Sequence, residues 1–152
     1  MNHARRQAIQ RLTVISLAIS SGLLSSSEAT AVEWQAGLFE LKNMNDILKN
    51  MGGNFTPSAE VLINAPEIAE NGAVVPISVH SNVPGTEKIA ILVEKNPNPL
   101  SARITLPAGT EPTITTRVKM AGTSNVHALV QANGKWLIAT KEIKVTLGGC
   151  GG

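Results

Sequence analysis

The chain contains a single cysteine among its 152 residues. One cysteine cannot form a disulfide within its own chain, so this thiol must be free, joined to another molecule or chemically occupied. The count also excludes the cysteine sets of structural zinc sites and the C-x-x-C-H attachment site of haem. Beyond residue 31 the only histidines are His80 and His127, which lie far apart in the sequence. We therefore expect no metal site and no cofactor.

Sequence motifs of the common enzyme classes are also missing. The chain has no G-x-S-x-G, no G-x-G-x-x-G and no phosphate-binding loop. Glu67 and Glu70 lie three residues apart and could suggest a paired-carboxylate hydrolase. Their segment, APEIAENGA, is rich in turn-forming residues, which favours solvated side chains in a loop. We expect no catalytic residue in this chain.

Residues 1–31 have the pattern of a cleaved export signal. Three arginines precede the uncharged apolar stretch from Leu12 to Leu24, and Ala29-Thr30-Ala31 forms an A-x-A cleavage site. The apolar stretch is shorter than the roughly 17–25 residues that a membrane span requires. This pattern predicts a periplasmic protein that retains no membrane segment after cleavage.

The type of signal has two interpretations. Arg5-Arg6 resembles the pair of a twin-arginine signal, which exports folded proteins. Ala8 and Gln10 depart from that motif, so an ordinary Sec signal that contains two arginines remains the alternative. In either case, cleavage would remove three of the 13 basic residues and one of the 11 acidic residues. The remaining charges balance, which leaves no basic stripe for nucleic acid.

Residues 32–147 are expected to form one β-rich domain with an N-terminal helix. Helical spacing of apolar residues predicts a helix over residues 38–51, which Gly52-Gly53 would end. Seven strand-like segments follow, the last two joined by a type I′ hairpin turn at Asn133-Gly134. They span residues 61–66, 73–81, 88–95, 102–107, 113–120, 125–132 and 135–147. This series predicts an immunoglobulin-like antiparallel β-sandwich.

Two irregularities are expected within these strands. Pro76 cannot donate a backbone hydrogen bond, which predicts an edge or a bulge at this position. In the last strand, the inward apolar positions change from Trp136 and Ile138 to Ile143 and Val145. This change from even to odd positions predicts a β-bulge near residues 140–142.

The cysteine, Cys150, lies in the closing sequence VTLGGCGG, between two pairs of glycines. Glycine has no Cβ, so residues 148–152 would form a narrow and flexible arm. A free thiol is only a few per cent thiolate near neutral pH, and the sequence places no base beside it. If the arm left the domain after Val145, the thiol could reach about 17 Å from it. The thiol is therefore suited to presentation to other proteins rather than to catalysis.

Three segments of the chain resemble the SoxY family of sulfur carriers. They are KVTLGGCGG at 144–152, APEIAENGAVVP at 65–76 and EKNPNPL at 94–100. The terminal segment is the most specific of the three. Together with the export signal and the β-rich body, the resemblance covers nearly all of the chain after residue 31.

The resemblance implies a chemical role for the arm. Cys150 would bind thiosulfate-derived intermediates covalently, and Gly148, Gly149, Gly151 and Gly152 would let the arm swing. It also implies an immunoglobulin-like fold and a heterodimer with SoxZ, a second small β protein. Transient partners would be the haem enzyme SoxAX, the hydrolase SoxB and, where present, SoxCD. The carrier itself would not be an enzyme.

An alternative function remains open from the residues alone. The protein could be an immunoglobulin-like binding module that is cross-linked through Cys150. A cross-link requires only an exposed thiol, whereas a carrier requires the flanking glycines for entry into a partner's channel.

We predict signal cleavage after Ala31, so that the exported protein begins at Val32. The reason is the A-x-A site directly after an uncharged apolar stretch. N-terminal sequencing of the exported protein checks this, and a sequence beginning at Met1 would contradict it.

Overall fold

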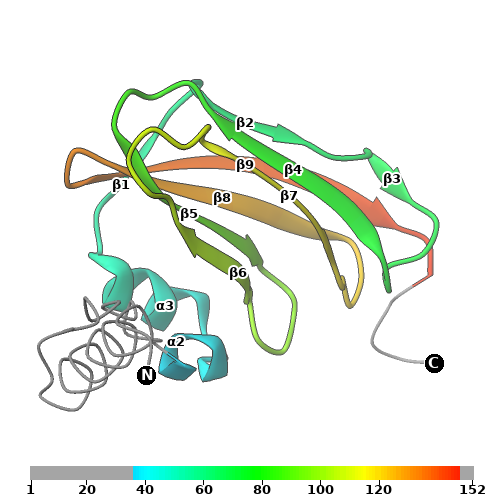
Figure 1. Cartoon of the computed structure of the whole chain (residues 1–152). Helices are drawn as coiled ribbons and strands as arrows, with labels where there is room; N and C mark the ends of the chain where they lie inside the picture. Colours follow the sequence, from blue (N-terminus) through cyan, green and yellow to red (C-terminus); the bar gives the residue numbers. More distant parts are fainter. Residues whose placement is uncertain (1–35, 148–152) are drawn as a thin grey trace, which may run out of the picture. The chain divides into compact units, whose positions relative to one another are not determined.

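The computed structural model describes residues 36–147, so the expected export signal and the glycine–cysteine arm lie outside the described residues. Two short helices, α2 and α3, precede nine strands in this part of the chain (Figure 1). The helices are α2 (Ala36–Glu40) and α3 (Met44–Met51), and the strands are β1 (Phe55–Pro57), β2 (Val61–Asn64), β3 (Ile68–Ala69), β4 (Val75–Ser81), β5 (Thr86–Val93), β6 (Leu100–Thr105), β7 (Thr113–Val118), β8 (Ser124–Ala132) and β9 (Lys135–Val145).

The strands form two sheets, as expected for an immunoglobulin-like sandwich. The larger sheet has the strand order β1-β9-β8-β5-β6, with β3 also paired to β9, and the smaller sheet has the order β2-β4-β7. Most neighbours are antiparallel, but the short strands β1 and β3 both run parallel to β9. The prediction of a mainly β, immunoglobulin-like fold is confirmed, with these two parallel additions at the edge.

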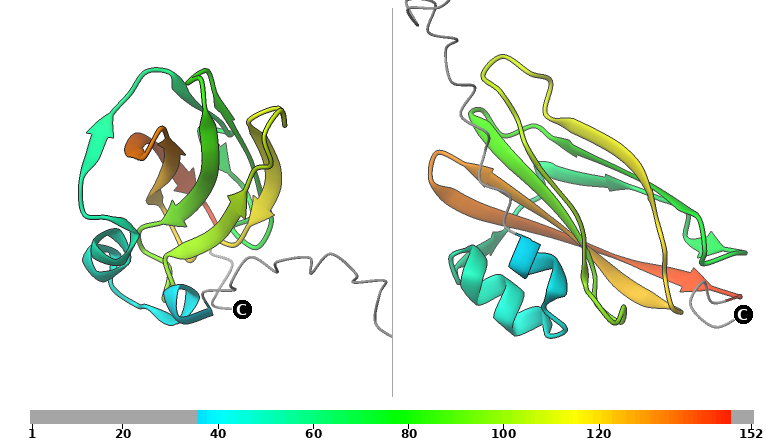
Figure 2. Two further views of the ribbon diagram at one scale, coloured as in Figure 1. Left: turned by 60° about the vertical axis from the view of Figure 1, so that its left-hand side comes forward. Right: turned by 60° about the horizontal axis from the view of Figure 1, so that its bottom comes forward.

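The sandwich interior is one of two hydrophobic clusters. It joins β2, β4 and β7 of the smaller sheet to one face of the larger sheet, through residues such as Ile77, Ile91 and Ile143. The second cluster lies on the opposite face of the larger sheet, where Ile47 of α3 packs with Leu129 and Trp136. Figures 1 and 2 show both helices on this side, away from the smaller sheet. The larger sheet is therefore covered on both faces.

These two covered faces explain why the bulge predicted near residues 140–142 is wrong. The pairing of β9 with β8 is continuous from Lys135 to Ile143. The side chains of Trp136 and Ile138 belong to the helix-side cluster, and those of Ile143 and Val145 belong to the sandwich interior. An uninterrupted strand presents successive side chains to opposite faces. The apolar positions change from even to odd because the first ones pack against the helices and the later ones pack in the sandwich interior.

The helix predicted over residues 38–51 is also wrong, because the structure divides it into α2 and α3. Asn43 has an extended backbone, and its side-chain oxygen accepts a hydrogen bond from the backbone N–H of Asn45 at 2.8 Å. This is the geometry of an N-terminal cap, which starts a new helix at Met44. The predicted stop is confirmed, since the backbone N–H of Gly52 and that of Gly53 both donate to the carbonyl of Leu48.

Two other local predictions concern Pro76 and the final hairpin. β4 is the central strand of the smaller sheet, but β2 pairs with it only as far as Ser78. Pro76 therefore has a paired neighbour on one side only, at Arg117 of β7, and the strand behaves there as an edge. Asn133 and Gly134 have φ values of 50° and 73°, as a type I′ turn requires.

We predict that Ile91→Ala destabilises the domain by about 2–5 kcal/mol, because it removes a fully buried side chain and leaves a cavity. Leu62→Ala is the matched control: its side chain is exposed on β2, and its loss should change stability by less than about 0.5 kcal/mol. Urea unfolding of both variants checks this, and equal shifts of the two midpoints would contradict it.

Candidate functional site

The functional site that the sequence predicts depends on where the chain leaves the sandwich. Cys150 and its four glycines, Gly148, Gly149, Gly151 and Gly152, lie outside the described residues. The described chain ends at Leu147, whose carbonyl accepts a hydrogen bond from the backbone N–H of Gly72 at 2.7 Å. One residue earlier, the backbone N–H of Thr146 donates to the carbonyl of Ala69 at 3.1 Å. We call residues 144–147, from which the arm departs, the arm root.

The segment from Glu67 to Gly72 lies beside the arm root along its whole length. Ile68 and Ala69 of β3 pair in parallel with Lys144 and Val145 of β9, and Figure 1 shows the two strands side by side. The backbone N–H of Lys144 donates to the carbonyl of Glu67 at 2.9 Å. Thr146 adds a side-chain bond, because its hydroxyl donates to the carbonyl of Glu70 at 2.9 Å. The arm root is therefore held against the 67–72 segment by a short parallel pairing and is not a loose tail.

This pairing changes one part of the interpretation of Glu67 and Glu70, the turn, and leaves their side chains solvated as expected. The segment was expected to be a turn, but it contains the short strand β3. Both glutamates are exposed, and within residues 36–147 neither carboxylate has a hydrogen-bond or ion-pair partner. Their backbone carbonyls, rather than their side chains, make the contacts with the arm root.

The turn between β7 and β8 holds the arm root from a second direction. The hydroxyl of Thr123 accepts a hydrogen bond from the backbone N–H of Val145 at 2.9 Å. The backbone N–H of Met120 donates to the carbonyl of Gly72 at 2.7 Å. Gly72 thus bridges Met120 and Leu147. Thr123 is not among the residues that the sequence predicts for the site, and no motif around it indicates this contact.

The segment EKNPNPL, at residues 94–100, connects to the same turn. Asn96 donates through its side-chain amide to the carbonyl of Lys119 at 2.7 Å and accepts from the backbone N–H of Ala121 at 3.0 Å. The side-chain amide of Asn98 donates to the carbonyl of Phe39 at 3.0 Å. Both internal segments that resemble the SoxY family therefore lie in one network with the arm root. The asparagines of N-P-N were the available signal for these contacts.

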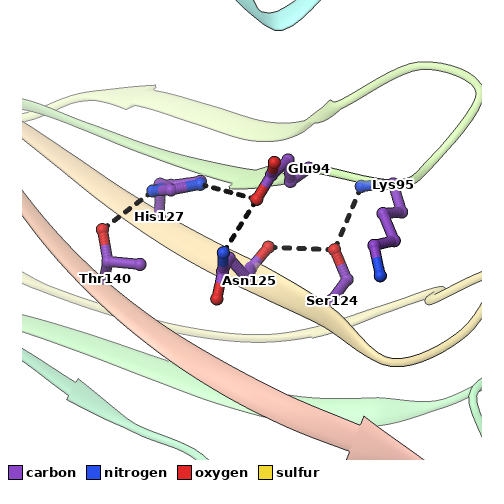
Figure 3. Close-up of polar contacts among 6 residues, drawn as sticks. All are labelled: Glu94, Lys95, Ser124, Asn125, His127 and Thr140. Atoms are coloured by element: carbon purple, nitrogen blue, oxygen red, sulfur yellow. Dashed lines mark hydrogen bonds and ion pairs between the residues drawn. The ribbon is translucent and has the colours of Figure 1, made fainter.

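A polar network around His127 fixes the start of this segment on β8 (Figure 3). The His127 Nε2 atom lies 3.6 Å from Glu94 Oε2, and its Nδ1 atom lies 2.8 Å from the hydroxyl oxygen of Thr140. Asn125 donates to Glu94 Oε2 at 2.9 Å, and the hydroxyl of Ser124 accepts from the backbone N–H of Lys95 at 3.0 Å. The network joins the end of β5 to the middle of β8 and β9.

Burial lowers the pKa of His127 below its ordinary value, because the side chain is only 14% exposed and the charged ring loses hydration. The nearby Glu94 carboxylate acts in the opposite direction but does not outweigh burial. His127 and its partners Glu94 and Thr140 therefore form a partly buried polar network.

His80 lies elsewhere, on the smaller sheet. Its Nδ1 atom is 2.7 Å from the hydroxyl oxygen of Thr113, and its Nε2 atom is 2.9 Å from Asn82 Oδ1. Within residues 36–147, no three histidine, cysteine or acidic side chains gather as metal ligands would. In the same range, no helix has both the length and the apolar character needed to cross a bilayer.

The hydrogen bonds of the arm root limit how far the thiol reaches. Thr146 and Leu147 are both held by the 67–72 segment, so the departure after Val145 that the sequence analysis considered does not describe this structure. Three residue steps separate Leu147 from Cys150. An extended chain covers about 3.3–3.6 Å per residue, so Cys150 lies within about 10 Å of the Leu147 backbone.

Comparison with known proteins supports one family. The sequence profile described as "Sulfur oxidation protein SoxY" matches residues 48–150. A solved structure of the sulfur carrier protein SoxY from Chlorobium limicola f thiosulfatophilum matches with a TM-score of 0.62 and 36% identity, over 69% of this chain and 97% of that one. The human F-spondin reeler domain matches with a TM-score of 0.40 and 9% identity, over 60% of this chain and 95% of that one, which is too weak for inference. No curated protein sequence matches significantly.

We predict that His127 makes the domain less stable as the pH falls from about 7 to about 5. The pKa of His127 is lower in the folded state than the 6.5 of a free histidine, so the unfolded chain binds the proton more readily. The contribution of neutral His127 to the free energy of unfolding is therefore fully present above pH 6.5 and declines below it. In His127→Gln this part of the pH dependence should disappear. Urea unfolding across this pH range checks it, and parallel profiles for the two proteins would contradict it.

Proposed function

The chain belongs to the SoxY family of sulfur oxidation proteins, and we propose that it acts as a sulfur carrier through a covalent bond at Cys150. The observation that carries the proposal is the extent of the family match, which runs to residue 150 and so includes the cysteine. The family similarity supports a carrier role in sulfur oxidation rather than a catalytic role. The chemistry at Cys150 and the place where it occurs belong to the proposal.

The proposed loading step forms a bond between the Cys150 sulfur and the outer sulfur of thiosulfate. The thiol loses its proton, and two electrons leave the two sulfur atoms as the S–S bond forms. The product is a cysteine S-thiosulfonate, Cys–S–S–SO₃⁻. A haem enzyme of the SoxAX type accepts the electrons, because this chain supplies no resident redox group of its own under the proposal.

The proposed release step is hydrolysis. Water attacks the sulfur of the terminal sulfonate group, and the bond between that sulfur and the neighbouring sulfane sulfur breaks. Sulfate leaves, and two protons are released. The electron pair of the broken bond stays on the sulfane sulfur, so that Cys150 carries a persulfide. SoxB is the proposed hydrolase, and SoxCD, where a host has it, would oxidise the remaining sulfane sulfur before a second hydrolysis.

The described domain fits the part of a scaffold in this cycle. The arm root donates backbone hydrogen bonds to the carbonyl of Ala69 and the hydroxyl of Thr123 and accepts one from Gly72, so the point of departure is defined. Beyond it, the glycines of residues 148–152 add no side-chain bulk around the thiol. A defined starting point and a narrow arm together favour insertion of the thiol into another protein's active site.

The proposal includes a partner and a compartment. The signal pattern of residues 1–31 supports export to the periplasm, where the mature chain would form a noncovalent heterodimer with SoxZ. Uncovered sheet edges are prone to pair with other chains, which is a general reason for a β-rich protein of this kind to have a partner.

We predict that Cys150→Ser abolishes thiosulfate-dependent electron release in a system reconstituted with SoxZ, SoxAX and SoxB. A serine oxygen cannot form the S–S bond that holds thiosulfate. The stability of the domain should not change, because the neighbouring glycines offer no side chains to pack on the sulfur. Cytochrome reduction measures the electron release, and intact mass of the native protein identifies adducts on Cys150. Activity near that of the unmodified protein would rule out Cys150 as the attachment site.

The double variant Gly148→Ala, Gly149→Ala separates the carrier from a protein that is merely cross-linked through Cys150. Two added Cβ atoms should slow processing by partner enzymes, because the arm becomes wider and stiffer. They should leave disulfide formation between two chains unchanged, since that reaction requires only an accessible thiol. Unchanged processing would favour the cross-linked binding module.

A further inference from the structure

Exposed large apolar side chains are concentrated near the arm root. Among the described residues, four such side chains are strongly exposed: Leu62 at 47%, Ile68 at 59%, Val74 at 54% and Leu147 at 66%. Single exposed apolar residues are normal on a protein surface and need no explanation. Two of these four, Ile68 and Leu147, belong to the segments that pair at the arm root, and Val74 follows the first of these segments two residues after Gly72. We call Ile68, Val74 and Leu147 the root patch.

The backbone holds the three residues of the root patch close together. Ile68 pairs with Lys144, three residues before Leu147. Gly72, whose N–H binds the carbonyl of Leu147, lies two residues before Val74. The neighbours Ala69 and Val75 are buried in the sandwich interior, so the inward positions beside Ile68 and Val74 are already occupied by apolar side chains. The exposed positions of Ile68 and Val74 therefore do not arise from a lack of core.

The short reach of the arm brings any partner enzyme to this patch. Cys150 lies within about 10 Å of the Leu147 backbone, by the length of three residues. An active centre that acts on an adduct of Cys150 must come equally close. The protein that surrounds such a centre must then contact the side chains around Leu147. The contact is imposed by two backbone hydrogen bonds, from Thr146 to the carbonyl of Ala69 and from Gly72 to the carbonyl of Leu147, which keep Thr146 and Leu147 from lengthening the arm.

We infer that the root patch is the docking surface for the enzyme that removes sulfate from the Cys150 adduct, and that the rim of that enzyme's active-site channel is apolar where it meets the patch. The inference rests on the proposed function. Charged residues beside the patch carry both signs, since Glu67, Glu70 and Lys144 are all exposed there. Such a surface has little net charge to attract a strongly charged partner. Three side chains form a small contact, which suits an encounter that must end after each reaction.

The test uses the triple variant Ile68→Ser, Val74→Ser, Leu147→Ser, with Leu62→Ser as the matched control. All four side chains are exposed, so neither variant should lose core packing. Cys150 is loaded by tetrathionate: the thiolate attacks an inner sulfur, Cys–S–S–SO₃⁻ forms and thiosulfate leaves. Intact mass confirms equal loading in every variant. Sulfate release by purified SoxB is then measured against carrier concentration, with SoxZ bound.

The triple variant should raise the KM for the carrier about tenfold with kcat nearly unchanged, because it weakens docking but not chemistry. Leu62→Ser should match the unmodified protein, and the KM should change little with salt. Equal KM values for all three proteins would overturn the inference. Loss of SoxZ from the triple variant would overturn it as well, since the patch would then be a subunit interface. So would self-association of the unmodified chain that the triple variant abolishes.

The proposed function fails in a different way. If SoxB releases no sulfate from the loaded, unmodified carrier, Cys150 is not the processed site, whatever the variants do. If sulfate release requires the Cys150 adduct but the root patch has no effect on KM, only the docking inference is wrong.

Discussion

The pairing of residues 67–72 with the end of β9 is the constraint on which the functional arrangement depends. It consists of backbone bonds from Lys144, Thr146 and Gly72, to which the hydroxyls of Thr123 and Thr146 add side-chain bonds. Backbone bonds of this kind are hardly affected by changes of side chain, so the arm root is held in place without a dedicated motif. Everything proposed for Cys150 starts from this fixed point, because it decides how far a thiol three residues further on can reach.

The larger sheet supports the arm root because both of its faces are covered. Ile143 and Val145 pack in the sandwich interior, and Trp136 packs against the helices on the other face. β9 is thus held by apolar contacts along its whole length and cannot shift without exposing one cluster. A rigid strand that continues directly into a glycine-rich segment separates two tasks. Under the proposed function, the domain supplies a fixed position, and the glycines beyond it add no side-chain bulk around the thiol.

Much of the fold could be predicted from local patterns. The alternation of apolar residues identifies the strands, and Asn133-Gly134 specifies its hairpin turn, because these signals act between neighbouring residues. The β-bulge in the last strand and the single helix over residues 38–51 were wrong for the same reason, because one pattern of apolar residues is compatible with two different structures. The phase change in β9 reflects two covered faces rather than a bulge. The periodicity through residues 38–51 is compatible with one helix, but the side chain of Asn43 caps the N-terminus of a separate helix, α3.

The sequence by itself determined the family and the β-rich class, and it excluded a disulfide within the chain, because there is only one cysteine. Only the tertiary structure decided how far along the chain the residues before Cys150 are held against the sandwich. Residues 65–76 and 94–100 are separate in the sequence, yet both belong to the network that reaches the arm root. The root patch is likewise invisible in the sequence, where Ile68, Val74 and Leu147 look like any other core residues. Hydrogen bonds between distant segments bring these residues together, and such contacts depend on the folded path of the chain rather than on local spacing.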